Sequence, residues 1–174
     1  MQFHIHTADC SHPDFIRLVE LLDAGYYEQY GAVSLQYQPF NTLEDIRDVI
    51  LIYDGAKAVA CGGIRRHDED TAEVKRVFVH PDYRRQGLGS LVMRQLEKLA
   101  FKRGYRRVIL ETGKDMLPAV KLYTTLGYCL MEPFGPYVGD ELVCCMEKML
   151  AHTDEARVHP SGYNKIMPRS EQNS

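Results

Sequence analysis

The segment RRQGLGS, residues 84–90, joins a predicted strand to a predicted helix and puts two glycines at the helix start. The first N–H groups of a helix have no intrahelical partner, and the aligned peptide dipoles give that end a partial positive charge. Gly87 and Gly89 leave the backbone open to close approach, while Arg84 and Arg85 add positive charge. The segment predicts a phosphate or pyrophosphate site; the alternative is a tight turn with solvated arginines.

The glycine spacing excludes two common phosphate-binding folds. It fits neither GxGxxG, which is typical of dinucleotide-binding folds, nor the GxxxxGK[ST] pattern of nucleoside-triphosphate sites.

Hydrophobic periodicity predicts an antiparallel first half. Asp54-Gly55 is a strong signal for a two-residue hairpin turn, because such turns need positive φ. The elements expected before residue 80 are a strand at 2–7, a helix at 13–30 capped by Ser11, a loop at 31–40, a short helix near 42–48, and strands at 49–53, 57–64 and 72–79.

After residue 80 the pattern becomes helix 89–103, strand 107–111, helix 118–126 and strands near 128–131 and 142–149. Together the two halves predict a mixed α/β domain over residues 1–150. Residues 151–174 have little apolar periodicity and are expected to form a C-terminal tail, which can contribute to a homodimer.

Composition narrows the function classes. With 174 residues, 45% of them hydrophobic, the chain suits one compact domain, and its formal charge of -3 offers no general attraction to nucleic acid. No apolar run is long enough to cross a membrane and no secretory signal is present, so we expect a cytoplasmic protein. Five cysteines without CxxC spacing predict neither disulfides nor a metal site.

Four segments resemble the GNAT superfamily of acyl-CoA-dependent N-acetyltransferases. Residues 84–89, RRQGLG, are similar to its cofactor motif, and EVKRVFVHPDYR resembles its fourth strand with the Val-x-Pro-x-x-Arg exit. AVKLYTTLGY, residues 119–128, resembles its A-x-x-L-Y-x-x-x-G-F segment, and EKML resembles the end of its last strand. The resemblance implies a central, mostly antiparallel sheet of about six to seven strands flanked by helices.

The resemblance also implies where acetyl-CoA binds. Its pyrophosphate would lie on the glycine loop and its pantetheine arm along the fourth strand, which in this family splays from the fifth. The implied cofactor-binding residues are Phe78, Val79, Arg84, Arg85, Gln86, Gly87, Leu88, Gly89 and Ser90. One departure concerns Met116, which stands where many members have Asn or Gln contacting pantetheine.

Two residues are the catalytic candidates. Tyr123 matches the family tyrosine that protonates the CoA sulfur, although a tyrosine at this spacing also suits a helix core. Glu73 would take the amine proton through water, as in histone-type members; its alternative role is an ion pair with Lys75 or Arg76. Regular alternation would put Glu73, Lys75, Val77 and Val79 on one strand face.

Glu111 is a second candidate for the base or for holding a cationic acceptor. Tyr26, Tyr30 and Tyr37 are candidate substrate contacts, since aromatic rings and carboxylates bind cations. The predicted function is transfer of acetyl from acetyl-CoA, without a metal, to a primary amine of a small molecule by direct attack in a ternary complex. The alternatives are a protein lysine or N-terminus as acceptor, or a non-catalytic CoA-binding module.

Overall fold

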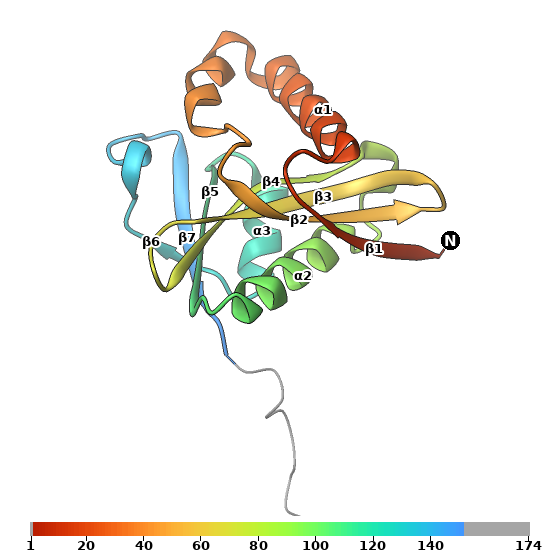
Figure 1. Cartoon of the computed structure of the whole chain (residues 1–174). Helices are drawn as coiled ribbons and strands as arrows, with labels where there is room; N and C mark the ends of the chain where they lie inside the picture. Colours follow the sequence, from red (N-terminus) through yellow and green to blue (C-terminus); the bar gives the residue numbers. More distant parts are fainter. Residues whose placement is uncertain (1, 152–174) are drawn as a thin grey trace, which may run out of the picture.

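The computed structural model describes residues 2–151, which form a seven-stranded sheet with helices on both faces (Figure 1). The elements in chain order are β1 (Phe3–Ala8), α1 (Pro13–Tyr30), the 3₁₀ helix η1 (Gly31–Phe40), β2 (Ile46–Asp54), β3 (Lys57–Arg66), β4 (Thr71–Val79), η2 (Pro81–Tyr83), α2 (Leu88–Lys102), β5 (Arg107–Gly113), α3 (Leu117–Thr125), β6 (Cys129–Met131), η3 (Gly135–Tyr137) and β7 (Val143–Met149).

The sheet order is β1-β2-β3-β4-β5-β7-β6. Neighbouring strands run antiparallel except β4 and β5, which are parallel and are connected through α2. The expected mixed fold with a mostly antiparallel sheet is confirmed.

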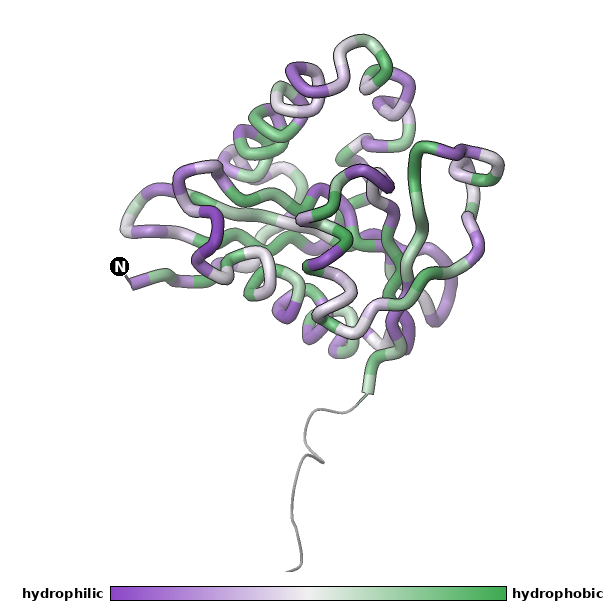
Figure 2. Tube along the Cα trace, turned by 180° about the vertical axis from the view of Figure 1, so that it is seen from behind, coloured by the Kyte–Doolittle hydropathy of each residue, from purple (hydrophilic) through white to green (hydrophobic). Residues whose placement is uncertain are grey.

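Each face of the sheet has its own core. On one face α1 packs Phe15, Leu18 and Leu22 against β2 and β3. On the other, α2 buries its apolar stripe, which includes Val92 and Leu96, together with residues of α3. Figure 2 shows the sheet strands as mostly hydrophobic and the helices as alternating, which is the pattern expected when one face of each helix is buried.

The N-terminal cap of α1 and the first residue of β2 differ from the sequence prediction. His12, not Ser11, caps α1, because its ring Nδ1 accepts from the N–H of Asp14 at 3.2 Å, while Ser11 hydrogen-bonds Asp9. The helix expected at 42–48 is wrong: β2 already begins at Ile46, where pairing with β3 satisfies the backbone.

The hairpin turn lies one residue later than predicted. Asp54 pairs with Lys57, so the two-residue loop is Gly55 and Ala56, with Gly55 at φ 58°. The tail predicted from residue 151 lies outside the described residues except for its first residue, and its part in a dimer stays a prediction. In the part of the chain that the structure describes, no helix is long and apolar enough to cross a membrane.

We predict that Gly62→Ala destabilises the fold. A Cβ at Gly62 would lie 2.8 Å from Val92 Cγ1 and 2.9 Å from Leu96 Cδ1, where α2 approaches β3. Overpacking of this kind costs roughly 1–3 kcal/mol, measurable by urea unfolding.

Gly25→Ala is the matched control, since a Cβ at Gly25 meets nothing within 4 Å and the helix gains roughly 0.5–1 kcal/mol from alanine. Equal stability of the two variants would contradict the close α2–β3 contact.

Candidate active site

The site begins where β4 and β5 separate. Their pairing covers only Thr71–Glu73 on β4 and Arg107–Ile109 on β5, although β4 continues to Val79 and β5 to Gly113. The separation that the resemblance implied is therefore present. Phe78 and Val79 pair with β3 on their other side. Backbone groups on the facing edges of the two strands are left for a ligand that is rich in amides.

The glycine loop lies at the end of β4. Gly87 caps α2 with φ 79°, and the first helical hydrogen bond runs from Leu91 N–H to Gly87. The N–H groups of Leu88, Gly89 and Ser90 precede that bond, so the helix itself leaves them without acceptors. A Cβ at Gly87 would meet nothing within 4 Å, which leaves the space before the helix open. This geometry fits an anion.

The other loop residues have separate roles. Arg84 folds back, donating from Nε to Val79 O at 3.2 Å, and Arg85 takes a left-handed backbone with φ 61°. A Cβ on Gly89 would lie 3.1 Å from Leu122 Cδ2. The second glycine is thus also required by the contact between α2 and α3.

A bulge changes the orientation of β4. Two residues, Arg76 and Val77, lie opposite the single Gly62 of β3, and Arg76 has φ 60°, a left-handed value that is unfavourable for arginine. The prediction that Glu73, Lys75, Val77 and Val79 share one face is wrong. After the bulge Val77 and Val79 pack on the α2 side, whereas Arg76 joins Lys75 on the α1 side.

Lys75 is the centre of a buried charge network. Its side chain is 2% exposed, and Nζ donates to Tyr137 Oη at 2.9 Å and to Glu111 Oε1 at 3.2 Å. Glu73 Oε1 lies 3.5 Å away, as an ion pair without a hydrogen bond. The network joins β4 and β5 to η3 across the region where the two strands no longer pair.

Glu73 itself is held from the other side. Its Oε2 accepts from Arg65 Nε at 2.8 Å, and its side chain is 3% exposed. The ion pair with Lys75 that the sequence offered as an alternative is present. Among the described residues that line the two cavities below, Glu73 does not occur, so its role as base stays a prediction.

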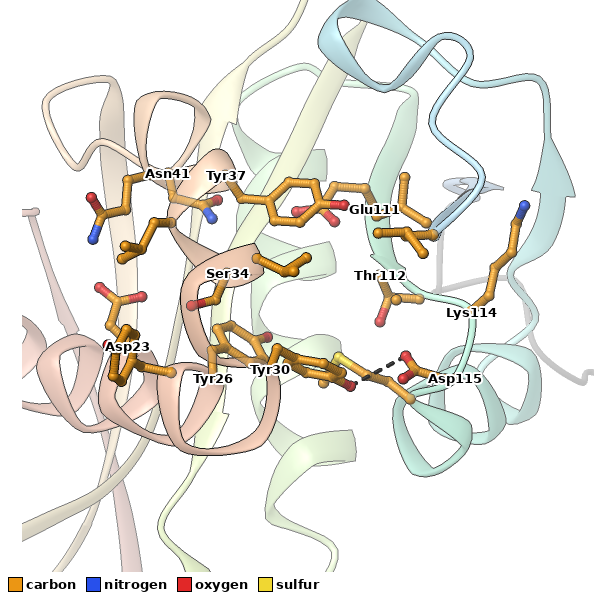
Figure 3. A pocket seen from close by; sticks show the side chains of 18 of the residues that line it. Asp23, Tyr26, Tyr30, Ser34, Tyr37, Asn41, Glu111, Thr112, Lys114 and Asp115 are labelled. Carbon is orange, nitrogen blue, oxygen red and sulfur yellow. Dashed lines mark hydrogen bonds between the residues drawn. The ribbon is translucent and has the colours of Figure 1, made fainter.

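Two adjoining cavities lie between α1, η1 and the β5 side of the sheet. The larger, about 940 Å³, is lined by the predicted acceptor residues Tyr26, Tyr30, Tyr37 and Glu111, as Figure 3 shows. The smaller, about 80 Å³, lies between the separated strands. Tyr26, Glu111 and Met116 line both, so the sequence candidates for acceptor binding come together in space.

Tyr123 of α3 lines the smaller cavity and is buried. Burial, with smaller effects from Tyr26 and Glu111, raises its pKa, so the phenol stays protonated at neutral pH. Burial likewise raises the pKa of Tyr26 to about 12; Glu111 adds to that rise, and Arg76 opposes it. A protonated phenol in the strand gap is placed to donate a proton.

Two hydrogen bonds bridge the larger cavity. Tyr30 Oη donates to Asp115 at 3.2 Å, the bond drawn in Figure 3, and Tyr37 Oη donates to Asp140 at 2.9 Å. These bonds connect α1 to the loop after β5 and η1 to the loop before β7. The cavity therefore has walls on opposite sides.

The sequence reasoning missed Lys75 and Arg76 as site residues. The available signal was their charge. Two consecutive cations follow Glu73 in a central strand, where unpaired charges are costly to bury. Among residues 2–151, no group of three or more His, Cys, Asp or Glu side chains is arranged to hold a metal ion.

The chain is similar to known proteins in sequence and in fold. The profile of the acetyltransferase (GNAT) family matches residues 15–128. An IAA acetyltransferase of Azospirillum brasilense is 35% identical over 138 residues, covering 78% of this chain and 90% of that protein.

Two solved structures have the same fold. A proposed acyl-CoA N-acyltransferase of Klebsiella pneumoniae is 32% identical with a TM-score of 0.71, covering 86% of this chain and 99% of that one. A GNAT-family acetyltransferase of Elizabethkingia anophelis with acetyl-CoA bound shares the fold at 18% identity and a TM-score of 0.64, covering 85% of this chain and 98% of that one.

We predict that Lys75→Met destabilises the protein strongly. Methionine fills a similar space but leaves the buried carboxylate of Glu73 with Arg65 alone and the half-buried carboxylate of Glu111 without its cation. Breaking a buried ion pair on one side costs about 3–5 kcal/mol, which guanidinium unfolding would measure.

Arg17→Met is the control, because the Arg17–Asp14 pair is solvated and such pairs contribute at most about 1 kcal/mol. Similar small losses for both variants would show that the Lys75 network is not a coupled buried cluster.

Proposed function

Because this chain belongs to the GNAT acetyltransferase family and is therefore an acyltransferase, we propose that it transfers acetyl from acetyl-CoA to the primary amine of a small molecule. The reaction is direct attack with both substrates bound. The observation that carries the proposal is the strand gap, which has the glycine loop at one end and opens through the cavity lined by Tyr123 into the walled acceptor cavity.

The donor side fits acyl-CoA. The free N–H groups at the start of α2 suit the pyrophosphate, and the unpaired edges of β4 and β5 suit the amides of pantetheine. When bound, the thioester supplies the activated acetyl group. Backbone N–H groups on β4 would then polarise its carbonyl.

The described geometry favours Glu111 over Glu73 as the proton acceptor. Glu111 lines both cavities, and one of its oxygens, Oε1, accepts from Lys75. Glu73 is instead occupied by Arg65. Glu111 takes a proton from the incoming ammonium, directly or through water, so that the neutral nitrogen forms the new C–N bond as the C–S bond breaks. Tyr123 protonates the departing sulfur. The nitrogen, positively charged after the attack, loses its second proton to water, which also reprotonates Tyr123.

The acceptor cavity supports a small molecule rather than a protein amine. A protein lysine or N-terminus needs an open groove, whereas the Tyr30–Asp115 and Tyr37–Asp140 bonds bridge this cavity. The Azospirillum relative is named for IAA as acceptor, which agrees with a small-molecule site.

We predict that Gly87→Glu abolishes acetyl-CoA binding, measured by isothermal titration. The introduced carboxylate would occupy the phosphate position and repel the pyrophosphate, weakening binding by about 100-fold or more. Gly104→Glu is the matched control: it adds the same side chain at another positive φ, 99°, beyond the opposite end of α2. Equal loss in both variants would assign the effect to backbone strain and contradict the phosphate site.

We predict that Tyr123→Phe lowers kcat by about 100- to 10,000-fold and leaves acetyl-CoA affinity intact. A continuous assay of CoA release measures kcat, and calorimetry measures the affinity. Tyr128→Phe is the control, since Tyr128 stacks edge-on against Tyr123 at 5.9 Å and is not among the residues that line either cavity. Full turnover by the Tyr123→Phe variant would remove the tyrosine from the proton path.

A further inference from the structure

The bulge in β4 presents two consecutive cations to the acceptor side of the sheet. A regular strand would direct Lys75 and Arg76 to opposite faces. Here both side chains lie on the α1 side, and both line the smaller cavity. The left-handed backbone of Arg76 is strained, and such strain is concentrated at functional sites.

The donors of these two cations are used differently. Lys75 has three acceptors close to Nζ, in Tyr137, Glu111 and Glu73, so its ammonium is occupied. Arg76 Nη2 donates to Asp23 Oδ2 at 2.6 Å. The Arg76 side chain is only 3% exposed, yet within residues 2–151 its Nε has no hydrogen-bond acceptor.

A buried hydrogen-bond donor on a charged group costs free energy when it has no acceptor. The contact between β4 and α1 does not use this Nε–H, because Asp23 of α1 accepts its hydrogen bond from Arg76 Nη2. Arg76 lines the cavity in which the amine must react, and its Nε–H is a buried donor of that side chain. An acceptor molecule that brings an oxygen to this point would complete the site.

We propose that Arg76 donates its Nε–H to a carboxylate carried by the acceptor, so that the acceptor is an amino acid with an aromatic or large apolar side chain. This inference rests on the proposed function and names its substrate class.

Of the residues that the structure describes, three charged ones line the smaller cavity: Lys75, Arg76 and Glu111. Because the Lys75 ammonium is already occupied, Arg76 and Glu111 remain to bind the head of an amino acid. Glu111 would take the ammonium and Arg76 the carboxylate, and both residues line that cavity with Tyr26 and Tyr123. Its volume is about 80 Å³. At roughly 10–15 Å³ for each water-sized group, it accommodates a head group but not a whole amino acid.

The side chain would extend into the larger cavity. Four tyrosines line that space, together with apolar residues of η1 and of the segment before β7. Tyrosine rings bury large apolar area and pack well against other rings. The tyrosines are Tyr26, Tyr27, Tyr30 and Tyr37.

The test compares amines that differ only by the carboxylate. CoA release from acetyl-CoA is followed with phenylalanine against phenethylamine and with tryptophan against tryptamine. A hydrogen bond to a charged group corresponds to roughly 10- to 100-fold. We therefore expect kcat/KM of the wild-type protein to be higher by that factor for the amino acids.

Arg76→Met should remove the preference, so that the ratio of kcat/KM for each amino acid to kcat/KM for its decarboxylated partner falls to about one, whatever the change in the absolute rates. Arg76→Lys keeps the charge but lacks the Nε–H at this position, and it should behave like Arg76→Met. Arg94→Met, an exposed arginine on α2, is the matched control and should retain the wild-type preference. Acetyl-CoA titration of each variant verifies that it is folded.

Equal rates for the two members of each pair in the wild-type protein would overturn the carboxylate assignment while leaving the acetyltransferase function intact. That comparison needs no variant, so it decides the question even if the Arg76 variants do not fold. Binding of acetyl-CoA without acetylation of any of the four amines would count against both the proposed function and this inference.

Discussion

The separation of β4 from β5 is the constraint on which the rest of the site depends. Two parallel strands pair over three residues at Thr71–Glu73 and then diverge, which leaves buried strand edges with unpaired backbone groups. Such edges are unfavourable unless something bonds to them. A ligand with amide groups can pair with them, and the start of α2 beside the gap supplies the complementary charge for its phosphates. The same separation opens the smaller cavity, whose lining includes Tyr123 and Glu111.

The gap is supported by side chains where backbone pairing is missing. Lys75 links β4 to Glu111 on β5 and to Tyr137 on η3, and Arg76 links β4 to Asp23 on α1. These bonds come from four elements that are distant in the chain. In a low-dielectric interior such charges are stable only when they are paired, so one network both supports the gap and defines the polarity of the acceptor end.

Much of the fold could be predicted, because periodicity and turn chemistry are local. All seven strands and all three α-helices that the structure describes lie within a few residues of their predicted positions, and the glycine loop caps α2 as its composition indicated. The errors occurred where non-local contacts override local preference. Residues 46–48 lie at the end of the predicted short helix but pair with β3, and Ser11 lies near a helix start that His12 caps instead.

By itself, the sequence determined the glycine loop that begins α2, the order of strands and helices, and the tyrosine on α3, since each depends on residues that are neighbours in the chain. Only the tertiary structure decided which side chains share a cavity. The bulge opposite Gly62 rotates Arg76 to the same side of the sheet as Lys75. The regular alternation of side chains along a strand does not predict that rotation, because it arises from the pairing of β4 with β3. The ion-pair partners, the walls of the acceptor cavity and the unpaired Arg76 Nε follow from that packing.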